Sequence, residues 1–383
     1  MTVTDSERLA SLRAEFPILS TCVYLNSNST GAVPRGVEDV LGRYWRTLST
    51  WRDEEWSGWL EQMAGYSAGL ARFIGAPAGS VVTDLNLSTL LARVASCLDF
   101  GAPRDKVVTT DLEFPTVPFI WRGFARYGAA LEVVGTGGPE FDEDALVEAI
   151  DERTVCVCVS HGSYSTGAAL DLRRVVDRAH SVGAYVIVDA YQTVGVVPLD
   201  VTALGVDFLL GGAHKWMCGA GTAFLYVRPD ILPDLRPAAT GWFAGDDPTS
   251  FGPPAGWAAD ARRLASGTPM ALGPMMSQVG LDLLSGVGVQ AIRRHSLACT
   301  DRVIERADAA GIEVVTPRDP SRRAGVVCLS FPGDRQVREA LLRAGMVCSW
   351  RGSLRVAPHF YNTIEEIDAF MDALEYERAR VTL

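Results

Sequence analysis

One stretch, Ala184–Leu225, constrains the fold of this chain more than any other: AYVIVDAYQTVGVVPLDVTALGVDFLLGGAHKWMCGAGTAFL. The apolar run Tyr185–Val188 ends at Asp189, and a second run, Val206–Leu210, leads through two glycines to Lys215. Short runs rich in β-branched residues are typical of buried strands. The stretch therefore predicts two strands whose ends present a carboxylate and an amine.

Lysine is almost absent from the rest of the chain. Of 35 lysine and arginine residues, only Lys106 and Lys215 are lysine, which leaves 33 arginines. A chain that keeps a lysine beside glycines at a strand end, and uses arginine elsewhere, indicates a chemical need for a primary amine. Pyridoxal phosphate has this need, because it is bound as a Schiff base to a lysine while a carboxylate keeps its ring nitrogen protonated.

Asp189 and Lys215 fit these two roles. Gln192 could donate a hydrogen bond to the ring hydroxyl oxygen of the cofactor, and His214 could reach its phosphate. The spacing alone leaves a second interpretation open, in which Asp189 caps a helix and Lys215 is an ordinary surface residue.

The segments DAYQ and GGAHKWMCGAGTAFLYV resemble the cofactor segment of the class V aminotransferase superfamily, a group of fold-type I enzymes that includes kynureninases and cysteine desulfurases. The resemblance extends over roughly Tyr24–Leu374. It implies an α/β fold with a large, mostly parallel α/β/α domain that holds pyridoxal phosphate, and a smaller C-terminal α/β domain. We expect the large domain over residues 21–250, with an N-terminal arm (1–20) and residues 251–383 outside it.

Strand-like and helix-like patterns alternate along the chain, which predicts repeated strand–helix units and a mainly parallel sheet. A long helical pattern over Val37–Ile74 comes first. Further strands are expected at Val81–Thr83, Lys106–Thr110, Leu131–Val134, Val155–Val159, Glu313–Thr316 and Val326–Phe331, and further helices at Ser88–Leu98, Glu143–Ile150, Leu172–Val182, Met276–Leu284 and Ala291–Ala310.

The turn between the strand Val81–Thr83 and the helix Ser88–Leu98 is the expected phosphate site. A turn that opens a helix presents free N–H groups and the positive end of the helix dipole. The resemblance implies that the cofactor phosphate lies here, against Asn86 and the backbone of Leu87. Family members often carry small hydroxyl residues at this turn, and this chain departs from that pattern. An ordinary capped helix would give the same local sequence.

Three further segments resemble parts of the family that surround the cofactor ring and the substrate. In DLEFPTVPF, Phe114 corresponds to an aromatic residue that lies on one face of the pyridine ring. In SHGSYSTGAALDL, Tyr164 corresponds to a residue near the substrate. In VYLNSNSTGAVPRGV, Asn28 and Thr30 are substrate-side candidates, although Asn, Ser, Gly and Pro also form plain turns.

The C-terminal third carries three more residues that the resemblance singles out. SLRVAPHFYNT implies that Arg355 binds the α-carboxylate of an amino acid, for which a planar guanidinium is well suited. Trp242 in GWFAGDDPTSF and Thr268 in SGTPM correspond to residues that reach the cofactor of a neighbouring subunit. The resemblance therefore implies a homodimer with shared active sites.

Composition narrows the class of partner. The net charge of −11 and the pI near 5.0 argue against nucleic acid. No apolar run is long enough to span a membrane, and the N-terminal sequence has no apolar signal core, so we expect a soluble, cytoplasmic protein. The eight cysteines lack metal-ligand spacing, which predicts reduced core thiols and no metal site.

The implied reaction acts on an α-amino acid through an external aldimine, with Lys215 as the general base. We expect a lyase that breaks a bond at Cβ, of the kynureninase or C–S type. An aminotransferase, or a decarboxylating or deaminating enzyme, is the alternative, and a non-catalytic paralogue is a third. A desulfurase fits poorly because no long loop separates Cys348 from Trp350 and Arg351. Val117 and Gly267, where kynureninases tend to have acidic and Asn residues, argue against kynurenine itself.

Overall fold

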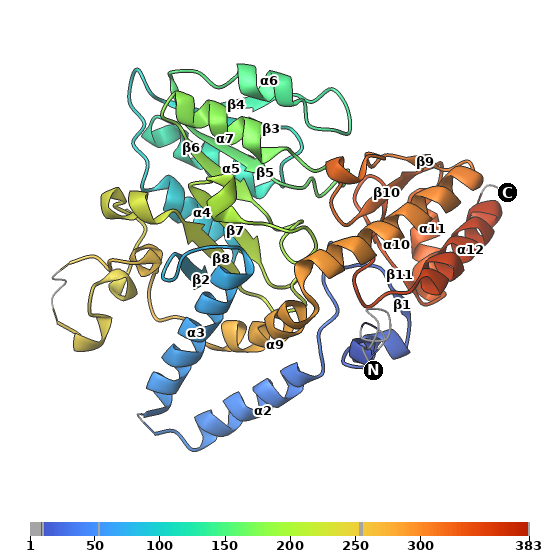
Figure 1. The fold of residues 1–383 in the computed structure, drawn as a ribbon, viewed down its shortest axis with the longest axis horizontal. Coiled ribbons are helices and arrows are strands. Elements are labelled where there is room, and N and C mark those ends of the chain that lie inside the picture. Colours follow the sequence, from blue (N-terminus) through green and yellow to red (C-terminus); the bar gives the residue numbers. More distant parts are fainter. Residues whose placement is uncertain (1–8, 10, 53, 253–255, 382–383) are drawn as a thin grey trace.

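A seven-stranded sheet forms the centre of the larger part of the molecule (Figure 1). The structure is a computed structural model, and it describes residues 9, 11–52, 54–252 and 256–381. Six strands of this sheet run parallel, and β8 alone runs antiparallel to its neighbours β7 and β2. The strands, in spatial order, are β2 (Val81–Asp84), β8 (Ala223–Val227), β7 (Phe208–Gly212), β6 (Tyr185–Asp189), β5 (Thr154–Ser160), β3 (Lys106–Thr110) and β4 (Ala130–Val134).

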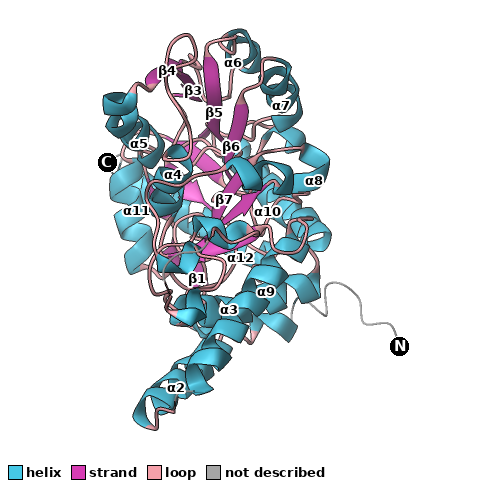
Figure 2. Cartoon of the chain, turned by 90° about the vertical axis from the view of Figure 1, so that its left-hand side faces the viewer, coloured by secondary structure: helices cyan, strands magenta, loops and turns pink. Residues whose placement is uncertain are grey.

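Helices cover both faces of this sheet, as Figure 2 shows for α4 and α5 on one side and α7 and α8 on the other. Successive residues of a strand point to opposite faces, so Val157 and Val159 enter one core and Cys156 and Cys158 the other. The expectation of free core thiols is confirmed for this pair. The helices are α4 (Leu87–Ala95), α5 (Thr116–Phe124), α6 (Glu143–Glu148), α7 (Leu172–Ser181), α8 (Val201–Leu204) and α9 (Leu272–Val287).

The helical pattern expected over Val37–Ile74 forms two helices, α2 (Gly36–Ser49) and α3 (Glu54–Phe73). The first ends because the backbone of Thr50 leaves the helical region. Figures 1 and 2 show α2 projecting from the body of the molecule. None of the helices in the described residues is both long enough and apolar enough to span a membrane.

A second, four-stranded antiparallel sheet lies in the C-terminal part, on the right in Figure 1. Its core packs against α10 (Val289–Ala309), α11 (Asp334–Arg343) and α12 (Ile364–Val381). Its strands, in spatial order, are β12 (Ser349–Trp350), β13 (Leu354–Val356), β10 (Val327–Ser330) and β9 (Glu313–Val314). A parallel pair, β1 (Val23–Tyr24) with β11 (Met346–Val347), ties the N-terminal segment to this part. The exact residue limits of the two domains stay a prediction.

Candidate active site

Two neighbouring parallel strands bring Asp189 and Lys215 to the same edge of the large sheet. Asp189 is the last residue of β6 and lies in register with Leu210 of β7, which ends at Gly212, three residues before Lys215. The carboxyl ends of parallel strands are the usual ligand-binding edge of an open α/β sheet. The register of the sheet therefore places the carboxylate and the amine at the same edge, as predicted.

Lys215 has an environment that favours the neutral amine. Its Nζ lies 4.9 Å from the ring centroid of Tyr191 and 5.6 Å from that of Phe114. Burial lowers the pKa of Lys215 to about 8, with Asp189 opposing this shift and the positive charges of Arg355 and Arg351 adding to it. An amine with a pKa near neutrality is a ready nucleophile for an aldehyde.

Asp189 is only 6% exposed, and its Oδ1 accepts a hydrogen bond from the N–H of Tyr191 at 2.9 Å. Burial raises the pKa of Asp189, and the Tyr191 hydrogen bond and the charge of Lys215 oppose the rise. Among the described residues, no ion pair within 4.0 Å joins this carboxylate to Lys215. A cationic ring nitrogen placed beside Asp189 would stabilise the carboxylate, so the pair fits pyridoxal phosphate.

The turn that follows β1 packs directly on the backbone of the lysine segment. The N–H of Gly31 donates to the carbonyl of His214 at 2.8 Å, and a Cβ at Gly31 would lie 2.0 Å from the carbonyl oxygen of Lys215. Only glycine allows this approach. The same turn carries Asn28, which is 1% exposed and accepts a hydrogen bond from Ser349 Oγ at 3.3 Å through its Oδ1.

Arg355 lies on β13 directly opposite Ser349, so it comes to the same place as Asn28. It is 3% exposed, and its Nη1 donates to the carbonyl of Tyr164 at 2.7 Å. Burial lowers the pKa of Arg355 to about 10. Within the described part of the chain, Arg355 Nε and Asn28 Nδ2 are buried donors without a hydrogen-bond partner. Buried donors in this state indicate a missing acceptor.

Two aromatic rings form a wall beside the lysine. The ring of Phe114, which is 44% exposed, meets the ring of Tyr164 edge-on at 5.2 Å between centroids. An exposed aromatic face next to a buried amine is a surface on which a flat heterocycle can stack. The structure thus brings Phe114, Tyr164, Lys215 and Arg355 together.

Gln192 and His214 also lie in this cluster. Gln192 Nε2 donates to the carbonyl of Asn28 at 3.0 Å, and its Oε1 accepts from Trp216 Nε1 at 3.1 Å. His214 Nδ1 lies 3.2 Å from the hydroxyl of Tyr191, and burial lowers the pKa of His214. Gln192 therefore ties the Asn28 turn to the lysine segment. The direct contacts of Gln192 and His214 with a cofactor stay predictions.

Asn86 is the N-cap of α4. Its side-chain oxygen accepts from the N–H of Thr89 at 2.9 Å, so this oxygen stabilises the helix start. The first-turn N–H groups that follow it, beginning with Leu87, have no partner within the helix. They are the groups that the prediction assigns to a phosphate, and that assignment stays a prediction.

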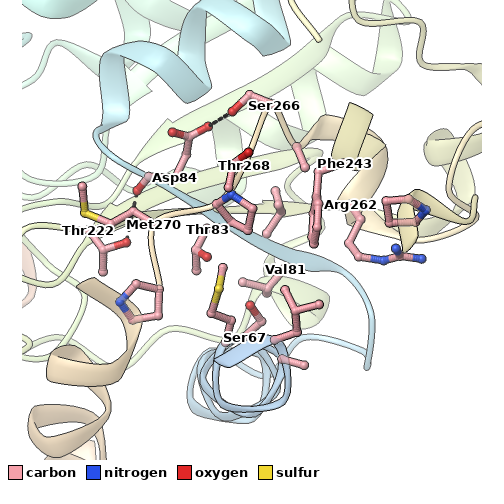
Figure 3. A pocket seen from close by; sticks show the side chains of 18 of the residues that line it. Ser67, Val81, Thr83, Asp84, Thr222, Phe243, Arg262, Ser266, Thr268 and Met270 are labelled. Carbon is pink, nitrogen blue, oxygen red and sulfur yellow. Dashed lines mark hydrogen bonds between the residues drawn. The ribbon is translucent and has the colours of Figure 1, made fainter. Parts of the chain in front are cut away.

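Trp242 and Thr268 belong to a different region. Trp242 stacks on Phe251 with 5.4 Å between centroids. Thr268 borders a cavity of about 780 Å³ between α3, the end of β2 and the segment around residue 268 (Figure 3). In this cavity Ser266 Oγ donates to Asp84 Oδ2 at 3.2 Å. The cavity lies beside the helix start at α4, and neither Lys215, Asp189 nor Arg355 borders it.

Sequence reasoning missed several residues of the cluster. Tyr191 lies inside the quoted DAYQ segment, but only its Asp and Gln were assigned roles. Ser349 and Ser160 gave no signal, because strand register alone brings them to Arg355 and Asp189. Glu113 precedes the predicted stacking residue Phe114 and is buried next to the same strand ends.

This geometry defines a class of protein. A mostly parallel sheet with a buried carboxylate, a lysine of lowered pKa and an aromatic wall at one edge is the arrangement of a fold-type I enzyme that uses pyridoxal phosphate. The chain belongs to the aminotransferase class V family, whose family model matches residues 23–370. The predicted family, fold class and cofactor are therefore confirmed.

Individual proteins show how far the similarity extends. The uncharacterized aminotransferase YcbU of Bacillus subtilis is 30% identical over 94% of this chain and 96% of its own length. The kynureninase of Pseudomonas fluorescens is 29% identical over 90% of this chain and 86% of its own. A solved structure of a C-DES variant with glycine linked to its cofactor has a TM-score of 0.88 at 21% identity, covering 95% of this chain and 98% of that one.

Proposed function

We propose that this protein is a lyase that breaks a bond at Cβ of an α-amino acid. The observation that carries the amino-acid substrate is the pair of unpartnered buried donors, Arg355 Nε and Asn28 Nδ2, at the site where Lys215 has a lowered pKa, and the kynureninase relatives favour the bond at Cβ. Two fixed donors suit the two oxygens of a carboxylate. When bound, pyridoxal phosphate supplies an electron sink for the substrate carbons.

Each residue of the cluster then has a task. Arg355 and Asn28 bind and orient the α-carboxylate of the substrate. Lys215 moves the proton at Cα, for which a pKa near 8 is well matched to neutral conditions. Asp189 holds a proton on the cofactor nitrogen by its negative charge, and Phe114 forms one wall of the site.

Two observations favour a lyase over the alternatives. Several relatives of similar identity are kynureninases, which supports cleavage at Cβ. Burial raises the pKa of Cys348 to about 12, so this thiol is poorly suited to the nucleophilic role that a desulfurase requires. An aminotransferase is the second candidate, because the YcbU relative bears that name. The paired donors and the lysine argue against a non-catalytic paralogue.

The proposal includes a homodimer in the cytoplasm. In that assembly Trp242 and Thr268 of one subunit approach the cofactor of the other. The apolar side chains of Leu41, Trp45 and Leu48 on the projecting helix α2 are exposed, which is typical of a surface that a partner covers.

The chain offers a sharp test of the site, because it has only two lysines. We expect borohydride reduction of the purified protein with its cofactor to attach the cofactor to Lys215, as located by peptide mass spectrometry. Lys106 is the matched control, since it is buried and pairs with Glu132 at 3.2 Å and Asp151 at 2.9 Å. Attachment at Lys106, or at neither lysine, would contradict the site.

The reaction itself needs a panel of amino acids and thioether conjugates. We expect release of a Cβ-cleavage product, such as pyruvate or alanine, without an added 2-oxo acid. Lys215→Ala should abolish this release, and Lys106→Arg should retain it. Amino-group transfer that depends on an added 2-oxo acid would contradict the lyase proposal and support the aminotransferase.

A further inference from the structure

Glu113 is a buried carboxyl group to which the proposed function assigns no role. It lies in the turn after β3, one residue before Phe114, and is 6% exposed. Its Oε1 accepts hydrogen bonds from Thr110 Oγ1 at 2.8 Å and from the N–H of Ser160 at 3.0 Å. Its Oε2 accepts from Ser160 Oγ at 2.5 Å. Glu113 therefore joins the turn that carries Phe114 to the end of β5.

Asp189 lies beside the end of β5, because it is the last residue of the neighbouring strand β6. Ser160 and Asp189 are direct partners in the β5–β6 register, so the residue that donates to Glu113 lies next to Asp189. The titratable groups that act on Glu113 from the packed elements are Asp189 on β6 and the buried thiol of Cys158 on β5. Lys215 acts on Asp189 from the opposite side of the site. No cation pairs with Glu113 among the described residues.

We propose that Glu113 is a positioning residue of the cofactor site, which keeps its own proton at low pH so that Asp189 alone is charged, and which adds a second negative charge there at higher pH. This inference rests on the proposed cofactor role of Asp189. Glu113 makes the negative charge around Asp189 depend on pH.

The physical basis is the proximity of two buried carboxyl groups. In the protein without cofactor both ionise together only at a cost, because each disfavours the charge of the other and no ion pair joins either of them to a cation among the described residues. Burial raises the pKa of Glu113 to about 7, the hydrogen bonds from Ser160 and Thr110 oppose this, and the charge of Asp189 adds to it. The proton is therefore lost near pH 7.

The first test uses the protein without cofactor and measures thermal stability against pH. A carboxyl group whose pKa rises on folding stabilises the folded state at low pH, and this stabilisation is lost as pH rises from about 4.5 to about 7. We expect the Tm of Glu113→Gln to fall less than the Tm of the wild type when the pH is raised from about 5.5 to about 7.5. Equal losses in the two proteins would overturn the proposal.

The second test follows the absorbance of the bound cofactor against pH. Glutamine resembles the protonated acid, so we expect Glu113→Gln to match the wild type near pH 6 and to lack the wild-type change centred near pH 7. Ser160→Ala removes a hydrogen bond that lowers the pKa of Glu113, so the change should move to higher pH. A merely structural role would instead alter the spectrum equally at both pH values.

Asp207→Asn is the matched control, because Asp207 is an equally buried carboxylate that pairs with Arg228 and His180 away from the site. We expect it to destabilise the protein and to leave the cofactor spectrum and its pH dependence unchanged. Loss of the pH-dependent absorbance change in Asp207→Asn would overturn the assignment of that change to Glu113. Failure of the borohydride test at Lys215 would contradict the proposed function, whereas the stability test of Glu113 stands without the cofactor.

Discussion

Lys215 must lose a proton before its amine can attack an aldehyde. Because its pKa is lowered to about 8, we expect the rate at which the cofactor-free protein binds pyridoxal phosphate to rise with pH and to level off above about pH 8. The charge of Asp189 holds this pKa up, so Asp189→Asn should move the midpoint to lower pH. Stopped-flow absorbance measures both rates. A midpoint that moved upward in Asp189→Asn would contradict the assigned direction.

At the scale of single residues, the sequence identified those site residues that are rare in the chain or that lie in a family motif. Lys215 was conspicuous because lysine is otherwise so rare, and Arg355 because of the segment around it. Glu113 and Ser349 could not be found in this way. Their importance arises from strand register, which places Ser160 beside Asp189 and Ser349 beside Arg355, and from burial that no short segment reveals.

Among the structural elements, the turn around Gly31 has no room for an added Cβ atom. Gly31→Ala would place a methyl group 2.0 Å from a backbone oxygen of the lysine segment, which cannot rotate away. We expect it to lower the free energy of unfolding by about 1–3 kcal/mol and to weaken cofactor binding. Gly221→Ala is the control in the loop after Lys215, since its added Cβ meets nothing within 4 Å. Denaturant unfolding and a cofactor titration measure the two effects, and equal behaviour of both variants would contradict the prediction.

Most elements of the large sheet were predictable, because buried parallel strands are short apolar runs that differ clearly from the amphipathic helices between them. The expected strand Lys106–Thr110 is observed with the same limits. The antiparallel direction of β8 could not be read from its sequence, since a buried strand has the same composition in either direction. The break between α2 and α3 was also missed, because the helical pattern continues across it.

The assembly as a whole is predicted to share its active sites, and mixed dimers test this. We expect Lys215→Ala subunits to be inactive, and subunits with both Trp242→Ala and Thr268→Ala to be strongly impaired. In a two-fold dimer each mixed pair contains one intact site, so an equal mixture should regain about one quarter of the wild-type activity. Activity assays after mixing and reassembly measure this. No recovery in verified mixed dimers would show that each site belongs to one subunit.

At the scale of the molecule, the sequence predicted the family and the two-part architecture, because the matching segments are spread from the N-terminal turn to Arg355. The pairing of β1 with β11 could not be predicted from the sequence. This pairing joins segments more than three hundred residues apart, and two-residue strands leave almost no periodic pattern. The same pairing helps to bring Asn28 to Arg355, so the least predictable contact supports the carboxylate site.

The ion pairs around Lys106 have a consequence for the chemistry of the protein in a cell. Because Glu132 and Asp151 hold that ammonium group in a buried position, its nitrogen is shielded from electrophiles. Reducing sugars form imines with unprotonated amines, and the guanidinium group of arginine does not react in this way. Of the two lysines, Lys215 should therefore be the one that sugars glycate, and bound cofactor would protect its nitrogen.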